Sequence, residues 1–283
     1  MMGGGPGMIV RDLRLPASEP VFAKRGDLAF FQQLGVKVDL TGISSAAYFA
    51  WLDQAKRRIP ELVPGAEIAE KPDARVCPVL NTGIYYDTLD YQIVSTGAFL
   101  RTTSAITHAF CAFKRPRDEH DVRTDHRYYF QGREKHALQC APTSAEAVAV
   151  VKRLLARTDI EHPGTFLYRY CGIRPTELEP AIIIKRYIST FYVWIDKRDA
   201  LRCPMDRVYV ADLRMPPGDR HLRGFREVEL VIYPRIAADV ARDPRVVELI
   251  ECLARLLRED LGAQTTNDIK YQRGIGALGI HHD

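Results

Sequence analysis

Hydrophobic and polar residues alternate most clearly in residues 224–232. At the two-residue period of a β-strand, the acidic residues Glu227 and Glu229 share one face with Phe225. The opposite face is apolar and consists of Val228, Leu230 and Ile232. Two acids one pleat apart raise each other's pKa unless a cation lies between them, and hard divalent cations take such oxygen ligands. The segment therefore predicts either a strand with a solvated acidic face or a pair of metal ligands.

The same alternation predicts further strands along the chain. They lie at residues 36–41, 76–86, 98–102, 109–114, 122–130, 182–187, 190–195, 202–205 and 207–213. In the strand at 122–130, Arg123, Asp125 and Arg127 share one face, opposite His126 and Tyr128. Polar and charged side chains are therefore collected on one side of the predicted sheet.

Apolar residues at helical spacing predict three main helices. The first spans residues 45–59 and is ended by Pro60. The second begins at a capping box formed by Thr143 and Glu146, and the third begins with Asp243 as its N-cap. These helices supply apolar faces that can cover a sheet.

The order of elements predicts an α+β fold. Strands follow each other too closely for crossover helices, which need about 10 residues or more each. We expect an antiparallel β-barrel or tunnel of about eight strands with helices packed outside, because closure removes exposed strand edges. Residues 1–20, rich in Gly and Pro, are predicted to form a flexible N-terminal segment, and residues 21–283 a single domain.

Composition places the chain among ordinary globular proteins. Of its 283 residues, 46% are hydrophobic and 27% charged, and the net charge of +4 does not by itself require a nucleic-acid partner. The sequence lacks a run of about 18 apolar residues and a signal-peptide core, so we expect a cytoplasmic protein without a membrane partner. Its six scattered cysteines form no CxxC pair, which favours reduced thiols over a zinc site.

Basic residues recur on the polar faces of the predicted strands. If those faces turn inward, the interior holds Arg101, Lys114, Arg123, Arg127, one of Lys185 and Arg186, Arg202 and Lys270. Each unpaired buried charge costs several kcal/mol, and Glu227 and Glu229 are too few to pair them all. A linear phosphate chain together with a divalent metal is the simplest partner. The alternative is that these side chains are solvated on the outside of an ordinary sheet.

Seven segments, in this order, resemble motifs of the CYTH/VTC superfamily, the triphosphate tunnel enzymes. They are 84–90 (similar to a YFDTPD turn), 97–101 (G..LR), 113–114 (TlK), 184–186 (a basic strand), 202–206 (RvTlD), 225–229 (F.EiE) and 269–271 (SKY). The resemblance covers roughly residues 36–275. The family's N-terminal ExExK strand corresponds here to residues 37–41, where Asp39 is the only acid, and residues 22–25 are the other placement. Thr103 replaces the second arginine expected after Arg101.

The resemblance implies a role for each group of residues. The catalytic residues it implies are Lys114, Arg101 and Lys270. The substrate-binding residues it implies are Arg123, Arg127, Lys185, Arg186, Arg202 and Lys37, of which either Lys185 or Arg186 points inward. The metal ligands it implies for Mg²⁺ or Mn²⁺ are Glu227, Glu229 and Asp39.

The activity implied by the resemblance is metal-dependent phosphoryl transfer or phosphohydrolysis, with tripolyphosphate, a nucleoside triphosphate or polyphosphate as the ligand. The nucleophile is water in a triphosphatase, a phosphate chain in a polyphosphate polymerase, and a ribose 3′-hydroxyl in a class IV adenylate cyclase. We favour hydrolysis because it needs no second substrate site. The missing N-terminal acids support a second hypothesis, in which a repurposed tunnel binds a phosphorylated or polyanionic ligand without phosphoryl transfer. Neither hypothesis predicts a nucleic-acid partner. Both are compatible with a homodimer.

Two further patterns are given structural interpretations. Residues 274–279 spell GxGxxG, but they lie too close to the end of the chain for the helix and second strand of a dinucleotide-binding unit. His108, His120, His126 and His136 share no ligand spacing, so we expect solvated or core histidines.

Overall fold

The structure is a computed structural model that describes residues 22–33, 35–117, 123–232 and 238–281. Its twelve strands form one antiparallel sheet. The order across the sheet is β1 (Phe22–Arg25), β2 (Leu28–Gln33), β8 (Arg123–Tyr129), β7 (Ala109–Arg117), β6 (Phe99–Ser104), β5 (Val79–Asp87), β9 (Glu179–Ile195), β10 (Arg198–Asp212), β11 (Arg223–Ile232), β3 (Gly35–Asp39) and β12 (Gln264–Thr266). Off this path, β4 (Ala66–Glu70) pairs with β9.

The predicted fold class is confirmed, with two refinements. The sheet has twelve strands where about eight were predicted, because short pieces such as β4 and β12 carry too few residues to show an alternation. In the part of the chain that the structure describes, no pairing joins β1 to β12. The curved sheet is therefore not closed into a barrel by hydrogen bonds.

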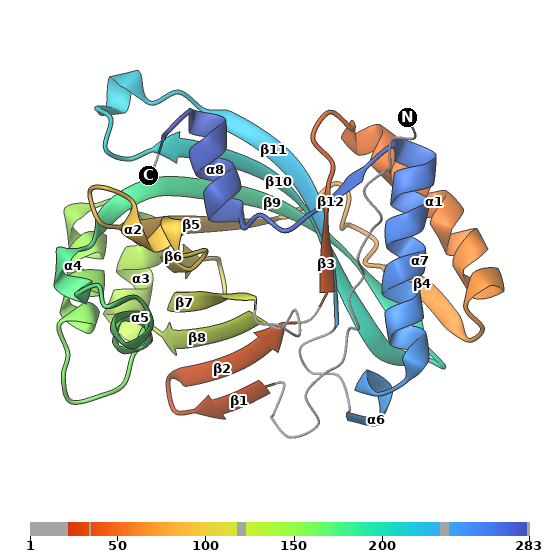
Figure 1. Ribbon diagram of the computed structural model, residues 1–283, viewed down its shortest axis with the longest axis horizontal. Coiled ribbons are helices and arrows are strands. Elements are labelled where there is room, and N and C mark those ends of the chain that lie inside the picture. The colour runs from red at the N-terminus through yellow and green to blue at the C-terminus, as the bar shows by residue number, and fades with distance from the viewer. Residues whose placement is uncertain (1–21, 34, 118–122, 233–237, 282–283) are drawn as a thin grey trace, which may run out of the picture.

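Eight helices accompany the sheet in the described residues (Figure 1). They are α1 (Ser45–Leu62), α2 (Gln92–Ser95), α3 (Gly132–Cys140), α4 (Ala145–Leu155), α5 (Pro163–Cys171), α6 (Ala238–Ala241), α7 (Pro244–Leu261) and α8 (Lys270–Leu278). In Figure 1, α1 and α7 run side by side at one end of the sheet, and α3, α4 and α5 gather at the other. No helix in the described ranges is both long and apolar enough to cross a membrane.

Strand β11 confirms the predicted alternation and defines two faces of the sheet. Val228 and Leu230 are fully buried and share a core cluster with Leu249 and Leu253 of α7. We call this side the outer face of the sheet. The inner face carries Phe225, Glu227 and Glu229, and it receives the charged residues of the neighbouring strands through the antiparallel register.

A second apolar cluster covers the outer face at the other end of the sheet. Leu100 of β6 and Phe113 of β7 pack there with Leu138 of α3, Val151 of α4 and Leu167 of α5. With the apolar side chains of both ends buried against helices, the polar side chains of the same strands are left on the inner face.

Helix α8 is the exception, because it packs on the inner face. It contacts β9, β10 and β11, and its Tyr271 and Ile275 are buried beside Phe225 and Val210. A side chain at position 274 would meet Ile182 and Val210 atoms at 3.1 and 3.3 Å, so Gly274 allows the helix to approach the sheet closely. The GxGxxG pattern is therefore part of a packed helix.

Several local predictions need correction. Helix α1 continues through Pro60 to Leu62, and its last turn still holds a hydrogen bond from Val63 N to Ile59 O. The N-cap of α4 is Ser144 and not Thr143, because the Ser144 hydroxyl accepts from Ala147 N at 3.1 Å. The strands predicted at 182–187 and 190–195 are one continuous strand, β9, and those predicted at 202–205 and 207–213 are likewise one strand, β10. The N-terminal segment 1–20 lies outside the described residues.

Candidate active site

The inner face encloses a cavity of about 210 Å³ bordered by strands of both halves of the sheet. Eight basic residues line it: Lys37, Arg101, Lys114, Arg123, Arg127, Arg186, Arg202 and Lys270. These are all but one of the basic residues predicted to bind or act on a ligand. The exception is Lys185, which is exposed, while its neighbour Arg186 points into the cavity. The alternation of β9 thus decides between the two, because adjacent residues of a strand face opposite sides.

One wall of the cavity, which we call the Asp125 wall, is formed by β7 and β8. Asp125 is fully buried, and its Oδ2 atom lies 3.1 Å from Lys114 Nζ and 2.6 Å from Arg127 Nη2. Burial alone would raise the pKa of Asp125, but the charges of Arg127 and Lys114 hold it below its ordinary value. Burial lowers the pKa of Lys114 to about 7, and nearby Asp125 only partly offsets this effect.

Next to this wall, β6 contributes polar groups with free hydrogen-bonding capacity. Arg101 Nη1 donates to Tyr85 Oη at 2.9 Å, and the Tyr85 ring stacks on Tyr271 of α8 at 4.9 Å. Within the described residues, Arg101 Nε and the hydroxyl of Thr103 have no hydrogen-bond partner, although both side chains are buried. Both residues line the cavity, so a bound anion can accept from them.

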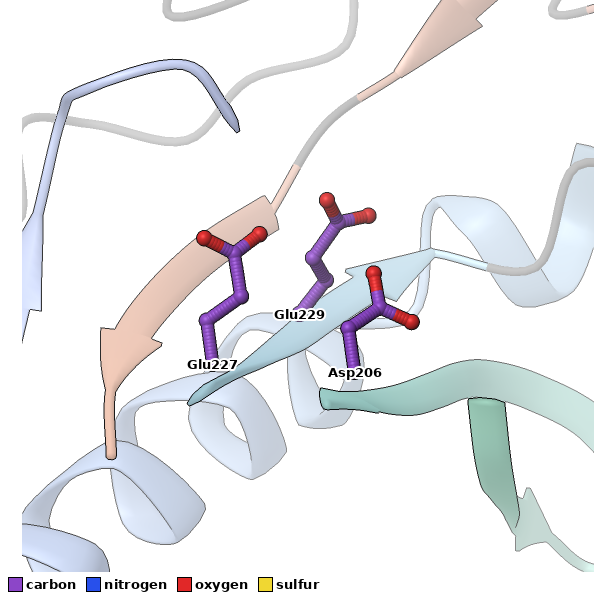
Figure 2. A group of neighbouring side chains, drawn as sticks. All are labelled: Asp206, Glu227 and Glu229. Carbon is purple, nitrogen blue, oxygen red and sulfur yellow. The ribbon is translucent and has the colours of Figure 1, made fainter. Parts of the chain in front are cut away.

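The opposite wall, which we call the carboxylate wall, is formed by β10 and β11. Asp206, Glu227 and Glu229 each place a carboxylate oxygen within 4.8 Å of the others (Figure 2). Asp206 and Glu227 are fully buried and lie opposite each other in the register of the two strands. Burial would raise the pKa of Glu227 and of Glu229, but the charges of Lys270 and Lys37 lower both.

Lys270, at the start of α8, reaches all three carboxylates. Its Nζ atom lies 3.0 Å from Asp206 Oδ2 and 2.5 Å from Glu227 Oε1, and it also donates to Glu229 Oε1. Burial would lower the pKa of Lys270, but Asp206 and Glu227 raise it above its usual value. Helix α8 is held in this position by the Tyr271 hydroxyl, which donates to buried Asp87 at 2.9 Å.

Asp39, the third predicted metal ligand, lies outside the group of three carboxylates. Arg273 of α8 donates to Asp39 Oδ1 at 2.5 Å and to Glu227 Oε2 at 2.7 Å. Asp39 is thus engaged by a guanidinium, and Asp206 stands as the third acid. Position 206 shares a face with Arg202 in the sequence pattern, but its proximity to Glu227 depends on the pairing of β10 with β11.

The three carboxylates form a donor set that suits one hard divalent cation. Asp206 Oδ1 is buried and accepts no hydrogen bond from any described residue, so it has a ligand position to offer. The Lys270 ammonium, however, stands among the same oxygens. The residues therefore fit Mg²⁺ or Mn²⁺ on the condition that Lys270 moves aside.

Comparisons with solved structures find proteins of similar architecture. A candidate adenylate cyclase from Bacillus halodurans matches with 12% identity and a TM-score of 0.48, over 86% of this chain and 97% of the other. HpAC1 from Hippeastrum, a candidate adenylyl cyclase with a dominant triphosphatase activity, matches with 14% identity and a TM-score of 0.47, over 89% of this chain and 100% of the other. The Pct1 RNA triphosphatase of S. pombe, solved with the Spt5 CTD, matches with 13% identity and a TM-score of 0.27, over 83% and 85%.

No protein-family model and no curated protein matches the chain. Each of these TM-scores is below 0.5.

Proposed function

We propose that the cavity binds a linear phosphate chain, as tripolyphosphate, polyphosphate or the triphosphate of a nucleotide. The observation that carries this proposal is the charge of the cavity. Among the described residues, eight basic residues line the cavity, and the four carboxylates that contact them there are those of Asp125, Asp206, Glu227 and Glu229. Positive charge gathered in a buried cavity is costly, and the negative oxygens of a phosphate chain are the groups that lysine and arginine side chains bind well.

The shape of the cavity supports a slender ligand. The cavity has a volume of about 210 Å³. A base-paired duplex is far larger than this space, whereas a short phosphate chain is narrow enough to lie between the two walls. The hydroxyl of Thr103 and the guanidinium of Arg101 supply donors in addition to charge.

For the reaction, we propose metal-dependent hydrolysis of a phosphoanhydride bond. Glu229, Glu227 and Asp206 are the residues that would hold Mg²⁺ or Mn²⁺, which supplies Lewis-acid stabilisation of negative charge on phosphoryl oxygens. Lys114 and Arg101 neutralise the charge that develops on nonbridging oxygens during phosphoryl transfer. Water is the simplest nucleophile, and polymerase-like or cyclase-like transfer would need a second acceptor in the same cavity.

The experiment that tests this proposal is phosphate release from tripolyphosphate, ATP and long-chain polyphosphate. Each substrate is assayed with Mg²⁺, with Mn²⁺ and with EDTA, alongside the thermal shift caused by each ligand. We expect metal-dependent release of phosphate from at least one substrate. We also expect tripolyphosphate to stabilise the protein, by an amount that increases with its concentration. The proposal is wrong if none of the three anions stabilises the protein.

A second candidate function is binding without phosphoryl transfer. The observation that favours it is the pairing of the three acids with cations of the chain itself, above all Lys270. In addition, Lys37 of β3 lies opposite Glu229, in the strand that resembles the family's acidic ExExK strand. This function predicts equal stabilisation by tripolyphosphate with and without EDTA and no phosphate release. Strict metal-dependent turnover would rule it out.

A further inference from the structure

We infer that Lys270 is the counter-ion of the carboxylate wall in the free protein, and that a divalent cation joins the three acids only together with a bound phosphate chain. The inference rests on the proposed function, since it assigns an order to the two ligands of the same site. It gives Lys270 a positioning role at the metal site in addition to its predicted contact with the ligand.

The first support is the charge balance of the wall. Lys270 contacts all three acids, Arg186 Nη1 lies 3.3 Å from Asp206 Oδ2, and Arg273 Nη1 lies 2.7 Å from Glu227 Oε2. Arg273 also binds Asp39, so four carboxylates meet these three cations, and Lys37 beside Glu227 and Glu229 adds a fourth positive charge when it is protonated. A free divalent cation therefore finds little net negative charge there, and it must displace a buried ammonium to reach the oxygens.

The second support is the position of Lys270 between the wall and the cavity. The residue is 5% exposed, and both Lys270 and Glu229 line the cavity that the phosphate chain would occupy. A lysine ammonium is a point charge on a flexible stem, so it can turn from carboxylate oxygens to phosphate oxygens without moving helix α8. When the Lys270 ammonium moves to the phosphate, the three acids lose one positive charge. A divalent cation can then replace that charge.

The third support is the way α8 is anchored. Tyr271 is hydrogen-bonded to Asp87 and stacked on Tyr85, and Gly274 is packed closely on β9 and β10. The helix is therefore a fixed base from which only the Lys270 side chain needs to move. Phosphate and metal then bind with positive coupling, and each must raise the affinity of the other by the same factor.

The test measures Mn²⁺ binding by water-proton relaxation, which distinguishes Mn²⁺ on the slowly tumbling protein from Mn²⁺ held by free tripolyphosphate. The wild-type protein is measured alone and with tripolyphosphate. We expect the Mn²⁺ affinity of the protein to rise by about 5- to 150-fold when tripolyphosphate is present, the usual range for coupled sites. Equal Mn²⁺ affinity with and without tripolyphosphate overturns the inference, and this arm needs no variant.

Two variants sharpen the test in the absence of phosphate. Lys270→Met should bind Mn²⁺ more tightly than wild type by a similar factor, whereas Lys185→Met, which removes an exposed lysine, should match wild type. If wild type without phosphate binds Mn²⁺ as tightly as Lys270→Met, Lys270 does not keep the metal out and the inference is wrong. This comparison is independent of the proposed function, which fails instead if tripolyphosphate does not bind.

Discussion

The two walls of the cavity bury acids in opposite electrostatic settings. On the Asp125 wall one carboxylate faces two close cations, Lys114 and Arg127. On the carboxylate wall three acids share the single ammonium of Lys270 as their common partner. Among the described residues the first wall has more cations than acids, and the second has three carboxylates that can serve as oxygen ligands. This difference supports the proposal that one side holds phosphate and the other side holds a cation.

The largest expected effect comes from breaking the Asp125 wall. In Asp125→Asn, Lys114 and Arg127 lose a buried counter-ion, so we expect the free energy of unfolding to fall by about 3–5 kcal/mol. Urea unfolding without ligand measures it, and tripolyphosphate should restore part of the loss. Asp159→Asn, at an exposed ion pair, is the matched control and should change stability little. A loss below about 1 kcal/mol in Asp125→Asn would show that the cations do not depend on this acid.

The second prediction compares two adjacent residues of β9, Arg186 on the inner face and Lys185 on the outer face. Arg186→Ala removes a cation that lines the cavity, and we expect the tripolyphosphate Kd to rise about 10- to 150-fold, the equivalent of one charge-assisted hydrogen bond of about 1.5–3 kcal/mol. Lys185→Ala removes an exposed cation and should leave the Kd nearly unchanged. Isothermal titration of both variants provides the comparison. Equal effects at the two positions would mean that long-range charge, and not contact in the cavity, controls binding.

A third prediction tests the carboxylate wall through turnover. Glu229→Gln keeps the shape of the side chain but removes a charge from the donor set, so metal-dependent phosphate release should fall by about 10- to 100-fold. Glu67→Gln, on an exposed position of β4, is the control and should retain wild-type rates. If Glu229→Gln stays within about threefold of wild type, this acid is not a ligand of a catalytic metal.

The smallest effect is a pH dependence of binding. Burial lowers the pKa of Lys37 and of Lys114 to about 7 in the free protein, whereas a bound anion favours their charged forms. Binding therefore takes up protons, and affinity should fall as pH rises above 7, by at most about tenfold per pH unit for each lysine. Titration calorimetry in buffers of different ionisation enthalpy measures the proton uptake. Lys114→Gln should reduce that uptake, and an unchanged value would assign it to other groups.

Local sequence pattern was sufficient for the faces of the central strands. The alternation in β11 placed Glu227 and Glu229 opposite Val228 and Leu230, and the structure confirms it. In β8 the same alternation placed Arg123, Asp125 and Arg127 together, and all three lie on the inner face. These predictions succeed because a strand's side-chain period is two, whatever the strand pairs with.

Helix α8 was missed because its local signals oppose a helix. Gly274 and Gly276 lower helix propensity, and the helix forms where Tyr271 and Ile275 can be buried on the sheet. Because this segment is a helix, the helix sets the direction in which the side chains of Lys270 and Arg273 point. Their contacts with the acids could therefore not be predicted from the strand patterns.

The sequence by itself determined which residues are charged, which strands carry them and on which face of each strand they lie. Only the tertiary structure decided that the polar face curves inward, that Asp206 completes the group of acids, and that Arg273 forms an ion pair with Asp39. The physical reason is separation along the chain, since Lys270 and Glu229 are 41 residues apart and Arg273 and Asp39 are 234 apart. Such contacts depend on strand order, register and helix docking, which alternation within one segment does not encode.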